Sequence, residues 1–278
     1  MSALFEGART FNQPIGNWNT SKVTNMNALF NNSLVFNQDI SNWNTQNVTN
    51  MGAMFRSARA FNQPIGSWNT TQVTDMSVMF GFTRAFNQPI GNWNTSKVTN
   101  MNTMFRDATA FNQNINDWDV SKVTTMRSMF QVATKFNQPL NNWNVGQVQD
   151  MASMFDGATA FNQDIGNWDT QNVVGMESMF QSALNFDQPI GSWNTQNVTL
   201  MNRMFLSATA FDHPLGNWDV TKVTSMDAML ENSGLSRSNY DQTLIGWAAQ
   251  NVQSNVPLGV TGLKYCSAET SRNTLANT

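Results

Sequence analysis

The sequence predicts an α/β solenoid, a right-handed coil with one short strand and one short helix in each turn. Three observations support this prediction: an uninterrupted repeat, an apolar pattern inside each repeat, and a polar surface with few charges. Phenylalanine recurs every 25 residues at Phe11, Phe36, Phe61, Phe86, Phe111, Phe136, Phe161, Phe186 and Phe211. Such self-similarity is typical of a stack of equivalent coils, each of which contacts only its neighbours.

The repeat divides the chain into three parts. Nine complete units run from residue 11 to residue 235, and residues 1–10 match the second half of a unit. The chain therefore begins within a repeat, either because it is part of a longer protein or because translation starts at Met1. A longer parent protein could carry further repeats and a signal peptide upstream. The period is lost after Leu235, so we expect residues 236–278 to form a cap over the last apolar face.

The second half of each unit predicts the helix. Met26, Leu29, Phe30 and Ser33 follow the spacing i, i+3, i+4, i+7, which places them on one face of a two-turn amphipathic helix. Thr24 or its equivalent precedes this segment in seven of the nine units, a position from which a hydroxyl can cap the first helical amides.

The first half of each unit, FNQPIGNWN in the first one, predicts a strand followed by a turn. Its apolar residues Phe11, Ile15 and Trp18 are separated by small and polar ones, although Pro14 removes one amide from any ladder. A strand and a helix within 25 residues fit the roughly 20 to 29 residues of a leucine-rich repeat. The prediction is therefore a leucine-rich-repeat-like solenoid.

The terminal segment predicts two helices and a short strand. Tyr240, Leu244 and Trp247 fall near one face of a first helix, the run VTGLKYC has strand character, and residues 267–275 could form a final helix.

Composition excludes several classes of function. Only 12% of the residues are charged and the formal net charge is -3, so clustered cations for nucleic-acid binding are missing. No run of about 20 apolar residues predicts insertion into a membrane, and the abundance of Trp and Phe argues against a disordered chain. Cys266 is the only cysteine, so no disulfide can form within the chain.

The surface is polar mainly because the chain contains 40 asparagines. In an uninterrupted stack, equivalent side chains lie above one another, and like charges in such columns destabilise. Amide side chains both donate and accept, so we expect asparagines to bond to their own copies in ladders. Asp187 and Asp212, which are adjacent in one column, are exceptions to this tendency.

The tryptophans form the most regular column of large side chains. We expect them to be a structural ladder in the interior, because burial of aromatic area is the simplest way to stabilise a short unit. The alternative is a stripe of indoles that stacks on sugars. The residues are Trp18, Trp43, Trp68, Trp93, Trp118, Trp143, Trp168, Trp193 and Trp218.

A threonine column is the candidate binding surface. Regular, weakly charged β-branched residues could match an ice lattice or contribute to an adhesive face. Thr24 and its copies form a second such column, four residues further along each unit. The candidate residues are Thr20, Thr45, Thr70, Thr95, Thr170 and Thr195.

Catalysis and metal binding have little support in the sequence. His213 is the only histidine and replaces the glutamine of one FNQ motif. Neither a phosphate-binding loop nor a cluster of Cys and His appears. A calcium ion between the adjacent acids Asp187 and Asp212 is conceivable but has little support in the sequence. We therefore expect a protein that is not an enzyme and carries no cofactor.

The segments WNTSKVTNM, MF and FNQPIGNW resemble the BspA-like leucine-rich-repeat family of bacterial surface proteins, from Met1 to about Leu235. The resemblance implies an extracellular or cell-surface location and adhesion to a protein or glycan ligand. We expect a non-catalytic scaffold that binds through an extended polar face. Ice binding and a passive spacer are the alternatives, and the uncovered first half-repeat could mediate an end-to-end dimer.

Overall fold

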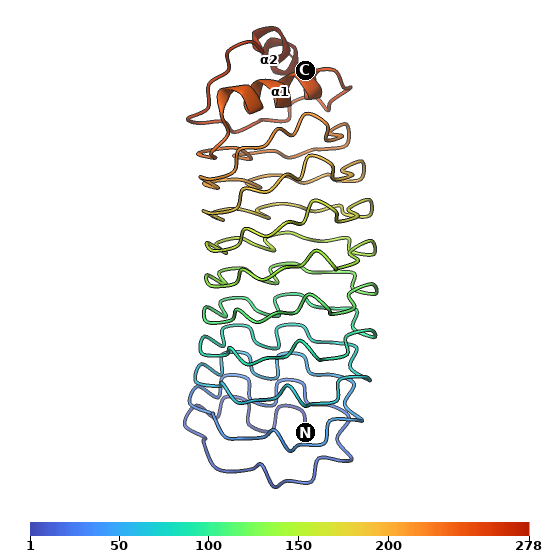
Figure 1. Cartoon of the computed structure of the whole chain (residues 1–278), viewed down its shortest axis with the longest axis vertical. Helices are drawn as coiled ribbons and strands as arrows, with labels where there is room; N and C mark the ends of the chain where they lie inside the picture. Colours follow the sequence, from blue (N-terminus) through green and yellow to red (C-terminus); the bar gives the residue numbers. More distant parts are fainter. Residues whose placement is uncertain (278) are drawn as a thin grey trace.

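The computed structural model describes residues 1–277 as an elongated rod of stacked coils (Figure 1). The N-terminus lies at one end of the rod. Helices α1 (Arg237–Ala248) and α2 (Glu269–Ala276) cover the other end. Each coil consists of one 25-residue unit, as the repeat predicts.

The predicted α/β content of the coils is wrong. Residues 1–236 contain neither an α-helix nor an extended strand, and the two helices of the described chain both belong to the terminal segment. Adjacent coils share only single parallel β-bridges, the first between Asn25 and Asn50 and the next between Asn50 and Asp75. The solenoid is therefore built from turns.

A ribbon of consecutive turns replaces the predicted helix. The N–H group of Leu29 donates to the carbonyl of Met26 at 3.2 Å, whereas that of Phe30 donates to Met54 in the next coil at 2.8 Å. Ala28 and Asn32 have φ angles of 54° and 60°, which a right-handed helix cannot contain. An isolated two-turn helix is marginal, and the ribbon instead uses half of its amides to join the coils.

Side-chain hydrogen bonds replace the predicted strand. Asn12 Oδ1 accepts the N–H group of Asn37, its copy in the next coil, at 2.9 Å. In the following coil the Nε2 group of Gln63 donates to Asn37 Oδ1 at 2.9 Å. This column joins the coils without a backbone ladder, so the proline that stands two residues further on in six of the nine units interrupts nothing.

The predicted capping role of Thr24 is also wrong, because no helix follows it. The adjacent Asn25 accepts the N–H group of Asn27 through Oδ1 at 2.8 Å and so starts the ribbon. Threonines of the Thr24 column bond between coils instead, and Thr49 Oγ1 donates to the carbonyl of Thr24 at 3.2 Å.

The core consists of stacked aromatic and methionine columns. Phe30 lies 3.9 Å from Phe36 within its coil and 5.7 Å from Phe55 in the next coil, measured between ring centroids. The indoles of Trp43 and Trp68 lie 6.5 Å apart and nearly parallel. Offset aromatic pairs each contribute about 0.5–1.5 kcal/mol beyond their burial, so identical neighbours stabilise the array along its whole length.

The terminal segment satisfies polar groups that the last coil leaves open. Thr243 Oγ1, in α1, accepts the N–H group of Leu215 at 3.0 Å. Gln250 accepts the N–H group of Val220 at 2.9 Å and donates to the carbonyl of Trp218 at 2.8 Å. The two predicted helices are present, whereas VTGLKYC forms a turn.

Candidate functional site

The tryptophan column lies inside the rod. Eight of its members are 0–4% exposed, and only Trp18, in the first complete unit, is 39% exposed. Each indole from Trp43 onward donates to a carbonyl of the preceding coil, as Trp43 does to Ile15 at 3.1 Å. The indole faces are stacked on their copies, which leaves no stripe for sugars along Trp43–Trp218.

The threonine column that we expected at the surface is buried as well. Thr20, Thr45, Thr70, Thr95, Thr170 and Thr195 are at most 2% exposed. The hydroxyl of Thr20 donates to the carbonyl of Asn44 in the next coil at 3.0 Å, and the other five make the equivalent bond. The expectation of an accessible surface is therefore wrong, because these hydroxyls hold the coils together.

The column that follows the tryptophans holds acceptors. Asn94 and Asp119 each accept the N–H group two residues further on, from Ser96 at 3.0 Å and from Ser121 at 3.0 Å. The hydroxyl of Ser121 also donates to Asp119, and these two bonds lower the pKa of its carboxyl group. Because the position only accepts, Asn and Asp serve equally, and pairing between copies is not its main role.

The adjacent acids Asp187 and Asp212 use their carboxylates in the same way. Asp187 accepts the N–H group of Asp212 at 3.0 Å and lies 3.2 Å from Nε2 of His213. Asp212 accepts the N–H group of Ser236 at 2.7 Å. Within residues 1–277 no group of three or more His, Cys, Asp and Glu residues is placed to hold a metal ion.

One face of the rod differs from the others because its residues change from coil to coil. We call it the variable face and define it as the ribbon positions outside the hydrophobic core, some of which are themselves buried: Asn27, Ala28, Asn31, Asn32, Leu34 and their equivalents at 25-residue steps in residues 2–234. In the column of Asn31, the ten coils carry seven residue types: Glu6, Asn31, Arg56, Gly81, Arg106, Gln131, Asp156, Gln181, Leu206 and Glu231. The tryptophan and FNQ columns scarcely change.

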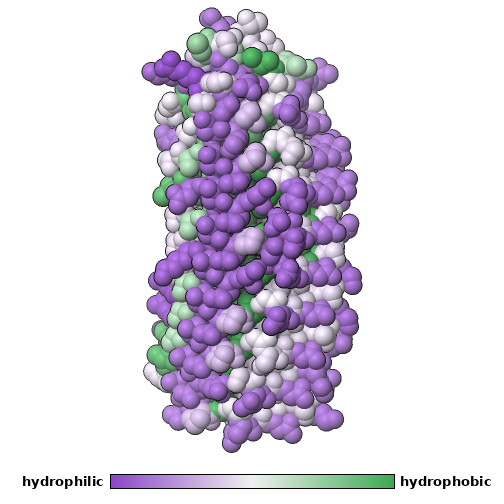
Figure 2. All heavy atoms as spheres, viewed as in Figure 1, coloured by the Kyte–Doolittle hydropathy of each residue, from purple (hydrophilic) through white to green (hydrophobic). Residues whose placement is uncertain are grey.

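Charge divides the variable face along the rod. Its first five coils carry more cations than acids, and its last five coils carry more acids than cations. The first five hold Arg9, Arg56, Arg59, Arg84 and Arg106 with Glu6 and Asp107, and the last five hold Asp156, Glu177, Asp227 and Glu231 with Arg127 and Arg203. Figure 2 shows one side of the rod, where hydrophilic residues run in columns along the length.

Two of these arginines are already paired. Arg84 lies 2.7 Å from the largely buried carboxylate of Asp107. Arg127 binds Glu177, two coils away, at 2.8 Å and lies 3.5 Å from Asp150. These ion pairs cross coils and fix the ribbon locally.

The remaining arginines are available to a ligand. Arg56, Arg59 and Arg106 form no ion pair among the described residues, and Arg106 lies 5.3 Å from the ring centroid of Phe82. Gly81, which lies between Arg56 and Arg106 in their column, has no side chain to separate them. Three arginines of the variable face thus form no ion pair, and one of them, Arg106, lies over an aromatic ring.

The variable face was not predicted from the sequence, because the prediction rested on the positions that repeat. The signal was present in the columns themselves, where one group of positions varies on an otherwise constant frame. Comparison of the ten residues of each column would have found it.

Comparisons with known proteins identify a repeat family. The model of the family described as "Mycoplasma protein of unknown function, DUF285" matches residues 1–88, 63–165 and 139–247. Together these matches span the array and nearly all of α1. No curated protein matches the chain. No helix among residues 1–277 is both long and apolar enough to cross a membrane.

Proposed function

The chain belongs to the DUF285 family, and on that premise we propose a non-catalytic repeat scaffold, located at a cell surface or secreted, that mediates adhesion through its variable face. The observation that carries this proposal is the contrast between the columns. Those that join the coils are nearly constant, whereas the variable face changes at almost every coil. Variation on a rigid frame lets a protein acquire a partner without loss of the fold.

The mechanism is avidity along an extended ligand. Each coil exposes only a few side chains on this face. The equivalent positions of adjacent coils are separated by about 4.8 Å, the distance between parallel-bridged chains. A polymer that follows the rod therefore makes many weak contacts whose contributions add.

The charge of the N-terminal half points to an anionic partner. Arg56, Arg59 and Arg106 form no ion pair among the described residues, although the charge of Arg106 opposes the burial that raises the pKa of Asp156. Guanidinium groups bind carboxylates and sulfates in a bidentate manner. An acidic glycan supplies such groups at regular intervals. The repeat motifs that resemble BspA-like leucine-rich-repeat surface proteins support the same type of role.

Binding of heparin, used as a model polyanion, tests the proposal. The variant Arg56→Gln/Arg59→Thr/Arg106→Gln introduces residue types that the same columns already contain, at Gln131 and Thr109 for example. We expect at least a ten-fold loss of heparin affinity at low salt. The matched control Lys22→Asn/Lys97→Gln/Lys122→Asn removes three charges outside the variable face. Equal losses in both variants would indicate unspecific charge attraction and would contradict the proposal.

Ice binding is the second candidate, carried by a threonine column that is exposed except at Thr199, which is half-buried: Thr24, Thr49, Thr74, Thr99, Thr124, Thr199 and Thr224. The Thr20 column, the other threonine column on which the ice-binding hypothesis rested, is buried and cannot contact ice. Measurement of thermal hysteresis tests this alternative. A passive spacer would bind neither heparin nor ice, and an end-to-end dimer through Phe5, Phe11 and Trp18 would double the mass in light scattering.

A further inference from the structure

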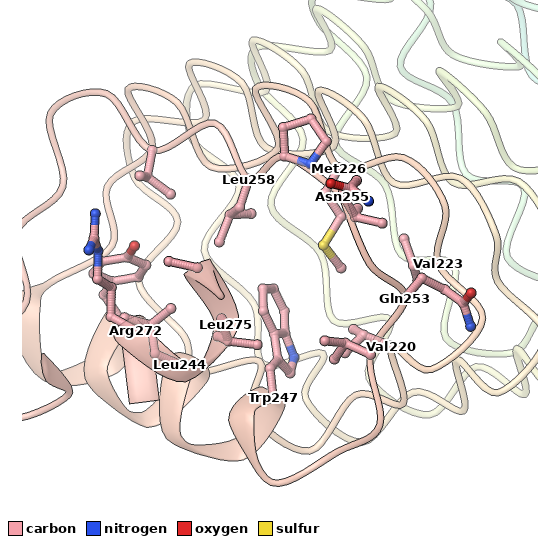
Figure 3. A pocket seen from close by; sticks show the side chains of 16 residues that line it. Val220, Val223, Met226, Leu244, Trp247, Gln253, Asn255, Leu258, Arg272 and Leu275 are labelled. Atoms are coloured by element: carbon pink, nitrogen blue, oxygen red, sulfur yellow. The ribbon is translucent and has the colours of Figure 1, made fainter. Parts of the chain in front are cut away.

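A cavity of about 540 Å³ lies between the last coil and the terminal segment (Figure 3). Val220, Val223 and Met226 line it from the coil, Leu244 and Trp247 from α1, and Leu275 from α2. Its volume and apolar lining are those of a small-molecule site rather than of a packing defect. The variable face does not include any of these residues.

The polar side chains that line the cavity are those of Tyr240, Gln253, Asn255 and Arg272. Arg272 of α2 lies at one end, next to Leu244, and Gln253 lies at the opposite end (Figure 3). Within residues 1–277 the guanidinium of Arg272 has no acidic partner, and its side-chain hydrogen bond is to Asn273 Oδ1 at 3.2 Å. An unpaired cation therefore stands at one end of an apolar space.

Tyr240 lies near this cation and lines the same cavity. Burial raises the pKa of its phenol, the positive charge of Arg272 opposes this effect, and the negative charge of Asp241 adds to it. The phenol stays protonated at neutral pH and can donate a hydrogen bond. A carboxylate at this end would thus meet one cation and one neutral donor.

We propose that this cavity binds a single-chain amphiphile with an anionic head, of which a medium-chain fatty acid is the simplest example. The carboxylate lies at Arg272 and the acyl chain extends among the apolar walls towards Val220. The charge at one end selects the head group, and the elongated lining selects an unbranched chain.

Titration calorimetry with monomeric sodium octanoate, decanoate and laurate tests the proposal on the full chain. We expect one ligand per chain, with an affinity that rises roughly four-fold per added methylene until the cavity is full. Absence of laurate binding would overturn the proposal. Binding of phosphatidylglycerol vesicles without binding of monomeric laurate would also overturn it, because a membrane surface would then be the partner.

Comparison of laurate with dodecanol, which has the same chain length but no charge, distinguishes binding at a specific site from nonspecific hydrophobic adsorption. Arg272→Gln should weaken laurate about ten-fold but leave dodecanol unchanged, since the alcohol lacks the charge. Arg237→Gln, an exposed position of α1 outside the cavity, is the matched control and should change neither. Equal weakening of laurate and dodecanol by Arg272→Gln would contradict the assigned pose. The heparin variants leave this cavity intact, so failure of one proposal does not imply failure of the other.

Discussion

The indole of Trp247, in helix α1, donates to the carbonyl of Leu215 at 2.9 Å. Trp218 makes the equivalent bond to Ile190 at 3.0 Å in the preceding coil. Trp247 therefore continues the tryptophan column, although it lies in a helix and the other members of the column lie in turns and loops of the coils. The 25-residue period is lost in the terminal segment, but the hydrogen bond that joins successive coils is kept.

Trp247→Phe should uncouple the terminal segment from the array. The substitution removes one of the two donors to the buried carbonyl of Leu215, which keeps only the N–H group of Trp218 at 3.0 Å. Loss of one such hydrogen bond costs about 0.5–1.5 kcal/mol. Hydrogen exchange should then lose protection first in the last coil, residues 211–235. Trp18→Phe is the control, because Trp18 is 39% exposed, and it should change exchange little. Uniform loss of protection along the rod would contradict this local coupling.

Val132→Gly should stabilise the array. Val132 has a φ of 58°, a conformation that costs a β-branched residue about 1–2 kcal/mol, and it is 39% exposed, so little packing is lost. We expect a gain of about 1 kcal/mol in urea unfolding. Val174→Gly is the matched control: it is 44% exposed without a positive φ and should destabilise instead. Destabilisation by both changes would disprove the strain at Val132.

The aspartates after the tryptophans should make stability depend on acid pH. Hydrogen bonds from the side chain and backbone of Ser121 lower the pKa of Asp119, and Thr221 does the same for Asp219. A folded-state pKa below the unfolded value of about 3.9 stabilises at higher pH, and this contribution is lost as the pH falls through the folded pKa. Asp119→Asn/Asp219→Asn keeps the acceptors, so the acid limb of a thermal-melting profile should become shallower. An unchanged acid limb would show that these bonds are not formed.

Asn144→Asp should destabilise through charge alone. The new carboxylate keeps the acceptor role towards Gly146, whose N–H group lies 3.1 Å from Asn144 Oδ1, but it lies between Asp119 and Asp169 in the column. Each like-charge contact costs about 0.2–1 kcal/mol. Melting in low salt should show the loss, and high salt should restore stability. Asn44→Asp, which has no acidic neighbour in the column, is the control, and an equal loss there would contradict the charge argument.

The sequence predicted the stack, the columns and the two terminal helices, because burial of Phe, Trp and Met in register depends on the period alone. The predicted helix was wrong for a definable reason. Left-handed residues recur four positions apart, as at Ala28 and Asn32, so the ribbon turns Met26, Leu29 and Phe30 inward at a spacing that a helix shares. A positive φ is usually indicated by Gly or Asn, so the alanine at position 28 gives no indication in the sequence that its φ is 54°.

The candidate sites were harder to predict for related reasons. Thr20 and Thr24 look alike in sequence, yet only the hydroxyl of Thr20 turns inward to the next coil. The asparagines were expected to pair with their copies, and Asn116 does donate to Asn141 at 3.2 Å. Most other asparagines that bond accept backbone amides or donate to carbonyls. The cavity depends on how the terminal segment packs against Val223, and the spacing of residues in the sequence does not predict that packing.

The affinity of shortened arrays for heparin tests the central claim most directly. Deletion of residues 36–60 removes Arg56 and Arg59 and keeps the 25-residue register. Deletion of residues 86–110 also keeps the register, but it removes Arg106 together with Asp107, the partner of Arg84. We predict a clear fall in affinity for the first deletion and a smaller one for the second, because Arg84 is then unpaired. Deletion of residues 136–160 or 161–185 should leave affinity unchanged or raise it, because acidic residues are lost. Equal effects of all four deletions would contradict adhesion through the variable face.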